Sequence, residues 1–99
     1  MARHSTISSD ILARYAADAA LEVTGVSALV PSQLHRHRGV RLDDSGDALR
    51  VEMHVSVEWG APIFELGRDV QERVREYLER MAHVSVEAVD VVVDQIAEP

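Results

Sequence analysis

The chain of 99 residues contains no cysteine, so it forms no disulfide and holds no metal through thiolates. It also contains no lysine, and its 10 basic residues are all arginines. Aromatic residues make up 4% of the chain, which leaves few rings for stacking on bases. The 17 acidic residues bring the formal net charge to -7, and such a chain repels a phosphate backbone. The composition therefore disfavours thiol chemistry and nucleic-acid binding.

Long apolar runs are missing as well. No stretch reaches the ~18 residues that a membrane-spanning helix needs, and no apolar segment follows the N-terminal residues 1–5, so we expect no secretory signal peptide. These absences predict a cytoplasmic protein that does not insert into a membrane by itself. The hydrophobic share of 46% is typical of a globular protein, and the length predicts one domain over residues 1–99, with flexible tails at 1–7 and 97–99.

Two segments have the periodicity of amphipathic helices. Apolar residues recur every three or four positions from Ile11 to Val23, after possible capping residues Ser8 and Ser9, and predict a helix over about 9–23. The second helix is predicted over about 62–82, where Pro62 suits the first turn. Its apolar stripe consists of Ile63, Leu66, Val70, Val74, Leu78 and Met81.

The remaining segments favour strands. Residues 49–59 alternate strictly between apolar and polar side chains, which predicts a strand with one wet face. The turn-forming residues 43–47 before it predict a hairpin with residues 40–42. Residues 26–30 predict a short strand, and residues 84–93 a final one with a bulge or its true start between Val86 and Val89. We therefore expect an α+β fold, in which a small three- to four-stranded sheet carries two helices on one face, in the order α-β-β-β-α-β.

A basic loop and one tryptophan are the candidate contacts for a partner. We expect the contacts to come from His35, Arg36, His37, Arg38, Arg41 and Trp59. Two alternatives stay open: His35 and His37 could ligate a metal, although two ligands are too few for a closed zinc site. Trp59 ends the apolar parity of its strand, so it either belongs to the core or contacts a partner at the rim.

No arrangement of residues predicts catalysis. The paired carboxylates Asp43 and Asp44, and likewise Asp90 and Asp94, have no nucleophile or apolar surroundings in the sequence, so we interpret them as turn and wet-face residues. Accordingly we expect no enzyme activity, no cofactor and no resident metal.

The ordered set of segments resembles the alkaline shock protein family, also called the envelope stress response family. The resemblance covers residues 8–96 and includes the helical stretch 11–26, the segment 38–42, the junction from Val57 to Ile63, helix residues 70–74 and the end 84–93. Two positions depart from the family pattern. Trp59 precedes Gly60 where the family has Tyr, and Ala82-His83 stands where the family has a Gly after the last Met of the helix.

The resemblance implies a non-enzymatic bacterial protein of the cytoplasm, linked to envelope stress and membrane homeostasis. It implies a self-associating scaffold or adaptor, a homo-oligomer that a membrane-anchoring partner protein can recruit to the inner face of the membrane. The alternative is a small RNA-binding domain of the KH type. Such domains clamp RNA with a Gly-x-x-Gly loop, whereas the sequence here reads Gly60-Ala61-Pro62-Ile63 without a second glycine. We therefore expect no nucleic-acid partner.

Overall fold

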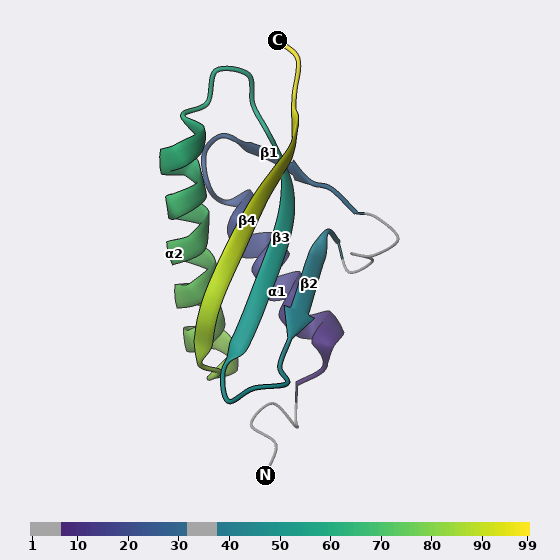
Figure 1. Ribbon diagram of the computed structural model, residues 1–99, viewed down its shortest axis with the longest axis vertical. Coiled ribbons are helices and arrows are strands. Elements are labelled where there is room, and N and C mark those ends of the chain that lie inside the picture. The colour runs from purple at the N-terminus through teal and green to yellow at the C-terminus, as the bar shows by residue number, and fades with distance from the viewer. Residues whose placement is uncertain (1–6, 32–37) are drawn as a thin grey trace.

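Strand β3 (Leu49–Val57) is the centre of the sheet, because it pairs with each of the other three strands. The computed structural model describes residues 7–31 and 38–99. The elements in chain order are α1 (Ser9–Leu21), β1 (Val26–Leu29), β2 (Val40–Asp43), β3, α2 (Ile63–Ala82) and β4 (Val86–Ile96), as Figure 1 shows. The predicted α+β fold and element order are thus confirmed.

The pairing makes a mixed sheet. Strands β1 and β2 lie antiparallel along one edge of β3, with Val26 opposite Val57 and Val40 opposite Met53. His54 joins the two, because its carbonyl accepts from Val30 and its N–H donates to Gly39 on that same edge. Strand β4 runs parallel along the other edge of β3. Parallel neighbours need a crossover connection, and α2 supplies it.

Strand β4 begins at Val86, and its register against β3 shifts directly afterwards, where Leu49 lies opposite Val86 but Arg50 opposite Ala88. This is the irregularity that the changed parity predicts. The antiparallel pairing of β2 with β3 confirms the predicted hairpin.

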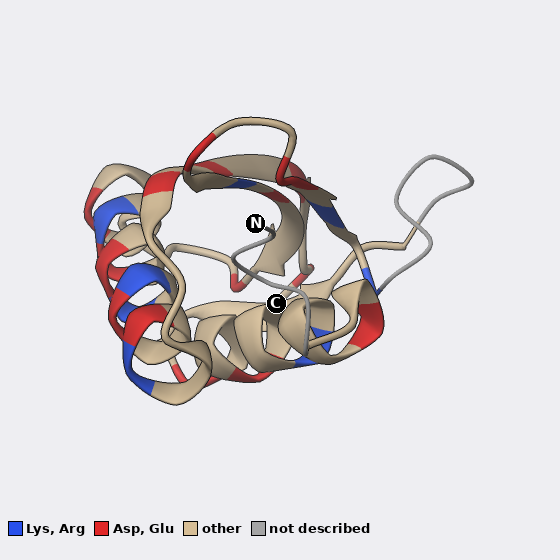
Figure 2. Ribbon diagram, turned by 90° about the horizontal axis from the view of Figure 1, so that it is seen from below, with Lys and Arg blue, Asp and Glu red and all other residues tan. Residues whose placement is uncertain are grey.

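Both helices cover the same face of the sheet, and the other face is open (Figures 1 and 2). The alternation in β3 explains this, because its odd-numbered residues from Leu49 to Val57 are buried under the helices. Small side chains let a helix approach a sheet closely. Helix α1 contributes mostly alanines to the core: Ala13, Ala16, Ala17, Ala19 and Ala20. The rings of Tyr15 and Tyr77 meet edge to face, with centroids 5.7 Å apart, where the helices touch.

The apolar stripe of α2 is buried in its middle and exposed at its ends. Leu66, Val70, Val74 and Leu78 lie in the core, whereas Ile63 and Met81 are exposed. The helix ends at Ala82, and His83 adopts the left-handed conformation with φ of 56°, the conformation that glycine most often provides there. Helix α1 is shorter than predicted, since it ends at Leu21 with Glu22 as its cap.

Two glycines are needed where backbones meet closely. Gly39 has φ of 79°, and a Cβ there would lie 2.9 Å from backbone atoms of Val30. Gly25 has φ of 102°, and a Cβ there would lie 2.6 Å from a methyl group of Leu66. Both positions therefore require glycine for conformation, and Gly39 requires it for space as well, because its close neighbours are backbone atoms.

Candidate functional site

The predicted partner contacts that the structure describes do not form one patch. His35, Arg36 and His37 lie outside the described residues, so the metal alternative at this pair of histidines is not addressed. Arg41 lies on β2 opposite Glu52, on the open face of the sheet, and Arg38 precedes β2 with φ of 59°. Trp59 lies beyond the opposite end of β3. The structure therefore separates Arg41 from Trp59.

Trp59 is exposed to solvent over 67% of its surface, so its interpretation as a core residue is wrong. Strand β3 ends at Val57, two residues earlier, and Gly60 turns the chain away with φ of 82°. The apolar parity therefore continues in the sequence after the strand has ended. The side chain is left at the rim, where it is available to a partner.

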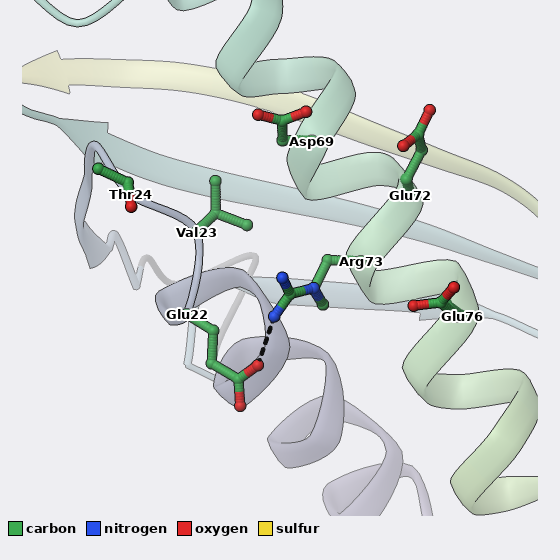
Figure 3. Close-up of a pocket in the computed structure, with 7 residues that line it drawn as sticks. All are labelled: Glu22, Val23, Thr24, Asp69, Glu72, Arg73 and Glu76. Carbon is green, nitrogen blue, oxygen red and sulfur yellow. Dashed lines mark hydrogen bonds and ion pairs between the residues drawn. The ribbon is translucent and has the colours of Figure 1, made fainter.

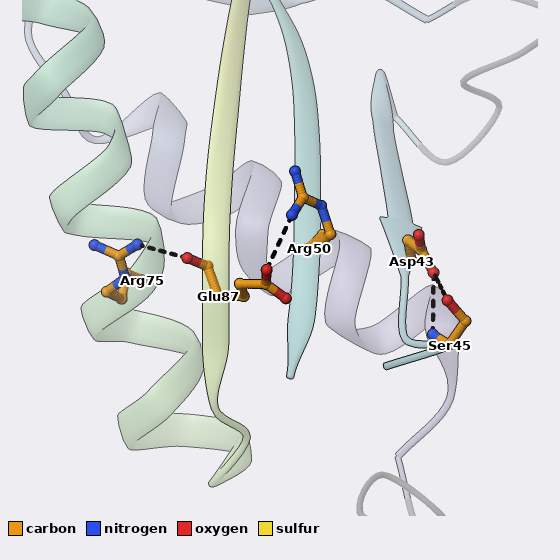
Figure 4. A network of polar contacts seen from close by, with 5 residues as sticks. All are labelled: Asp43, Ser45, Arg50, Arg75 and Glu87. Atoms are coloured by element: carbon orange, nitrogen blue, oxygen red, sulfur yellow. Dashed lines mark hydrogen bonds and ion pairs between the residues drawn. The ribbon is translucent and has the colours of Figure 1, made fainter. Parts of the chain in front are cut away.

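The open face of the sheet carries charged side chains that pair with one another. The Arg50 guanidinium donates to the Glu87 carboxylate at 3.1 Å across β3 and β4. Asp43 accepts hydrogen bonds from the backbone N–H and the hydroxyl of Ser45, which lowers the pKa of its carboxyl (Figure 4). Asp43 is the last residue of β2, and its side chain stabilises the turn that follows, within the predicted turn-forming segment 43–47. A shallow hollow of about 210 Å³ on this face is lined by Arg41, Asp43, Arg50, Val51, Glu52 and Asp90.

His54 is held between two carboxylates on the open face. Its Nε2 lies 2.8 Å from Glu52 and its Nδ1 lies 2.7 Å from Asp94 on β4. Burial lowers the pKa of His54, but the hydrogen bonds and charges of both carboxylates outweigh burial and raise the pKa above its ordinary value of 6.5. Both ring nitrogens can donate only in the protonated imidazolium, which this arrangement therefore favours.

An acidic cleft of about 390 Å³ lies between the end of α1 and the outer face of α2. Figure 3 shows Arg73 pointing toward Glu22, and the two form an ion pair at 2.7 Å. Asp69, Glu72 and Glu76 line the same cleft from α2. This exposed ion pair connects the C-terminal cap of α1 to α2 at the surface. No group of three or more His, Asp or Glu side chains in residues 7–31 and 38–99 is arranged to hold a metal ion.

The outer edge of β4 is covered over its first half by a row of α2 side chains. Glu79 accepts from the N–H of Val86 at 3.4 Å, Arg75 donates to the carbonyl of Glu87 at 3.4 Å, and Gln71 donates to the carbonyl of Val89 at 3.0 Å. These helix residues are four apart, which corresponds to ~6.0 Å of helix rise. Two strand residues span ~6.6 Å, so successive side chains of the helix row can reach alternate residues of the strand.

The next position in this row is Gly67, and the row of polar side chains stops there. A groove of about 420 Å³ opens at this point, between the first half of α2 and the second half of β4. Its lining residues are Ile63, Phe64, Gly67, Arg68, Gln71, Val91 and Val93. Phe64 is exposed over 84% of its surface, so it contributes apolar area that the fold does not bury.

The groove was not predicted from the sequence, although two signals point to it. Phe64 lies outside the buried stripe of α2, and Gly67 stands inside a helix, where glycine costs roughly 0.5–1 kcal/mol relative to alanine. A Cβ at Gly67 would meet no atom within 4 Å, so neither conformation nor space requires glycine there. Phe64 and Gly67 form a site only because β4 pairs with β3 and lies beside α2, an arrangement that no single segment of the sequence reveals.

Comparisons with known proteins concern the family and the fold of the chain. A family model described by a cell envelope-related function matches residues 2–98. No curated protein matches the chain. Among solved structures, MamM CTD in a copper form is similar with a TM-score of 0.69 and 18% identity, over 91% of this chain and 87% of that chain. A MamM-CTD variant is similar with a TM-score of 0.61 and 16% identity, over 92% of this chain and 100% of that chain. At these identities the likeness concerns the fold alone.

Proposed function

The chain belongs to the alkaline shock protein family, whose model spans nearly all of it, and from that premise we propose that it is a non-catalytic adaptor of the bacterial cell envelope. In this proposal it associates with copies of itself and binds partner proteins at the inner face of the membrane. The sequence resemblance to the family is confirmed, and with it the cell envelope-related role.

The observation that carries the proposal is the half-covered edge of β4 beside exposed apolar side chains. An unpaired strand edge offers backbone donors and acceptors to another chain. The exposed rings of Trp59 and Phe64 are of the type that protein interfaces use. By contrast, the charged groups that Figure 4 draws contact one another, the Ser45 hydroxyl or backbone atoms, which supports a surface role rather than a catalytic one.

Recruitment to the membrane through a second protein belongs to the proposal. No helix within the described ranges is long and apolar enough to cross a bilayer. The family resemblance supports an anchoring partner protein in that position.

Two measurements on the full chain test the proposal. Light scattering coupled to size-exclusion chromatography is expected to give a mass above that of the 11.0 kDa monomer. Affinity capture from native cells with membrane fractions retained is expected to enrich a membrane protein, and mixed RNA at low salt is expected to remain unbound. A strict monomer at high concentration that enriches no membrane protein would contradict the proposal.

A further inference from the structure

We propose that the groove between α2 and β4 binds an extended segment of a partner protein, in which apolar and basic residues alternate, as an additional strand beside Val91 and Val93. The inference rests on the proposed adaptor function and names the site and the chemistry of its partner. Three independent features carry it: the open half of the β4 edge, the glycine that keeps it open and the charge along the strand.

The backbone of β4 defines the direction of binding. Successive residues of a strand present their backbone groups to opposite edges. Because the carbonyls of Glu87 and Val89 face outward to Arg75 and Gln71, those of Val91 and Val93 face outward as well. Among residues 7–31 and 38–99, no α2 side chain donates a hydrogen bond to these two carbonyls. They are therefore in position to pair with an added strand.

Gly67 keeps this half of the edge accessible. The row of Glu79, Arg75 and Gln71 would reach the level of Val91 at position 67, and a side chain there would extend into the groove. Since a Cβ at Gly67 has open space around it, the fold itself tolerates a larger residue. A glycine that weakens its helix without a structural need is consistent with a binding groove that must stay empty.

The two sides of the added strand meet different surroundings. Side chains that point toward the helices enter a groove with Ile63, Phe64, Val91 and Val93 in its lining, so they are apolar. Side chains that point toward the open face lie near β4, and residues 84–99 contain four acids and no base: Glu87, Asp90, Asp94 and Glu98. Glu87 pairs with Arg50 and Asp94 with His54, which leaves the charges of Asp90 and Glu98 to attract a partner. These partner side chains are therefore basic. Arg68 at the groove adds one positive charge on the helix side.

The same charges disfavour a second copy of β4 as the occupant. If β4 strands from two copies paired side by side, Asp90 and Asp94 of one copy would lie near the same acids of the other, and His54 offsets only the charge of Asp94. Like charges opposite each other on paired strands are destabilising. A basic partner converts this repulsion into attraction.

The test measures binding of a fluorescent, end-blocked peptide of alternating valine and arginine to the full-length chain. The matched peptides are one in which glutamate replaces arginine and one with the same residues in two separate blocks. We expect binding of the alternating basic peptide alone, with affinity that falls as salt rises. Amide hydrogen exchange is expected to slow at Val91 and Val93 on binding.

Variants at position 67 separate the groove from the fold. Gly67→Gln should extend the polar row, fill the groove and weaken the peptide by about tenfold or more, which is ~1.4 kcal/mol. Gly67→Ala, the matched control, should retain binding within a few-fold, and Asp90→Asn should weaken it. Circular dichroism and thermal unfolding verify that each variant is folded.

Three outcomes overturn the inference: equal binding of the acidic peptide, no binding of any peptide, or an effect of Gly67→Gln on self-association alone, which would identify a second copy as the occupant. If the protein still self-associates and enriches a membrane protein in such a case, the inference fails while the adaptor function stands.

Discussion

Nδ1 of His54 on β3 lies 2.7 Å from Oδ2 of Asp94 on β4, while the other ring nitrogen contacts Glu52. The protonated ring thus joins the central strand to its parallel neighbour and neutralises part of two negative charges. Because β4 forms one side of the groove, this contact also helps to hold the strand that lines the proposed site.

The stability of the protein is predicted to fall as the pH rises above about 6.5. The pKa of His54 is raised in the folded state, so its contribution is fully present below the unfolded-state value of 6.5 and is lost as the pH rises through the folded-state value. Urea unfolding across this pH window measures the effect. His54→Asn should flatten the dependence, and an unchanged slope in that variant would contradict the assignment to His54.

Gly67→Ala is predicted to stabilise the protein by roughly 0.5–1 kcal/mol, because alanine loses less conformational entropy in a helix than glycine. The methyl group meets no atom within 4 Å, so no clash opposes the gain. Urea unfolding of the variant beside the natural chain measures it. A loss of stability would mean that Gly67 serves the fold, and the glycine would then no longer indicate a groove that must stay empty.

Leu78→Ala is predicted to cost roughly 2–5 kcal/mol in the free energy of unfolding, because it leaves a cavity in the core. Leu78 is completely buried, while Met81 on the same predicted stripe is exposed. The matched change Met81→Ala should therefore cost less than about 1 kcal/mol. Equal losses in chemical denaturation would show that the helix buries a different face.

Trp59→Ala is predicted to change stability by less than about 0.5 kcal/mol, as exposed positions do. The same variant should weaken self-association or partner capture if the ring lies in an interface. Acrylamide quenching of the single tryptophan checks its exposure directly. Strong protection of the ring in the monomer would contradict the structure at this junction.

Most of the fold was predictable, because the sequence pattern of each element lies within the element itself. The alternation in 49–57 specifies a half-buried strand, and the stripe from Leu66 to Leu78 specifies a helix that covers it. The side chain of Ser8 accepts from the N–H of Ile11 at 3.2 Å, so Ser8 is the cap among the two serines that the sequence offered. Each of these features depends on neighbours a few residues away.

The candidate site was predicted poorly, because it depends on pairing between distant segments. The parallel course of β4 beside β3 brings Val91 and Val93 to the level of Gly67, and no local pattern states that register. Trp59 was ambiguous for a related reason, since parity in the sequence does not mark where a strand stops. Arg41 lies on the open face beside Glu52 and is separated from the groove by β3 and β4.

Site-specific photo-crosslinking in native cells tests the central claim most directly. A crosslinking amino acid in place of Phe64 reports from the groove, and one in place of Glu76 reports from the helix–helix cleft as the matched control. The account predicts a crosslinked partner protein of the membrane fraction from position 64 and not from position 76. No product from position 64, or the same product from both positions, would contradict it.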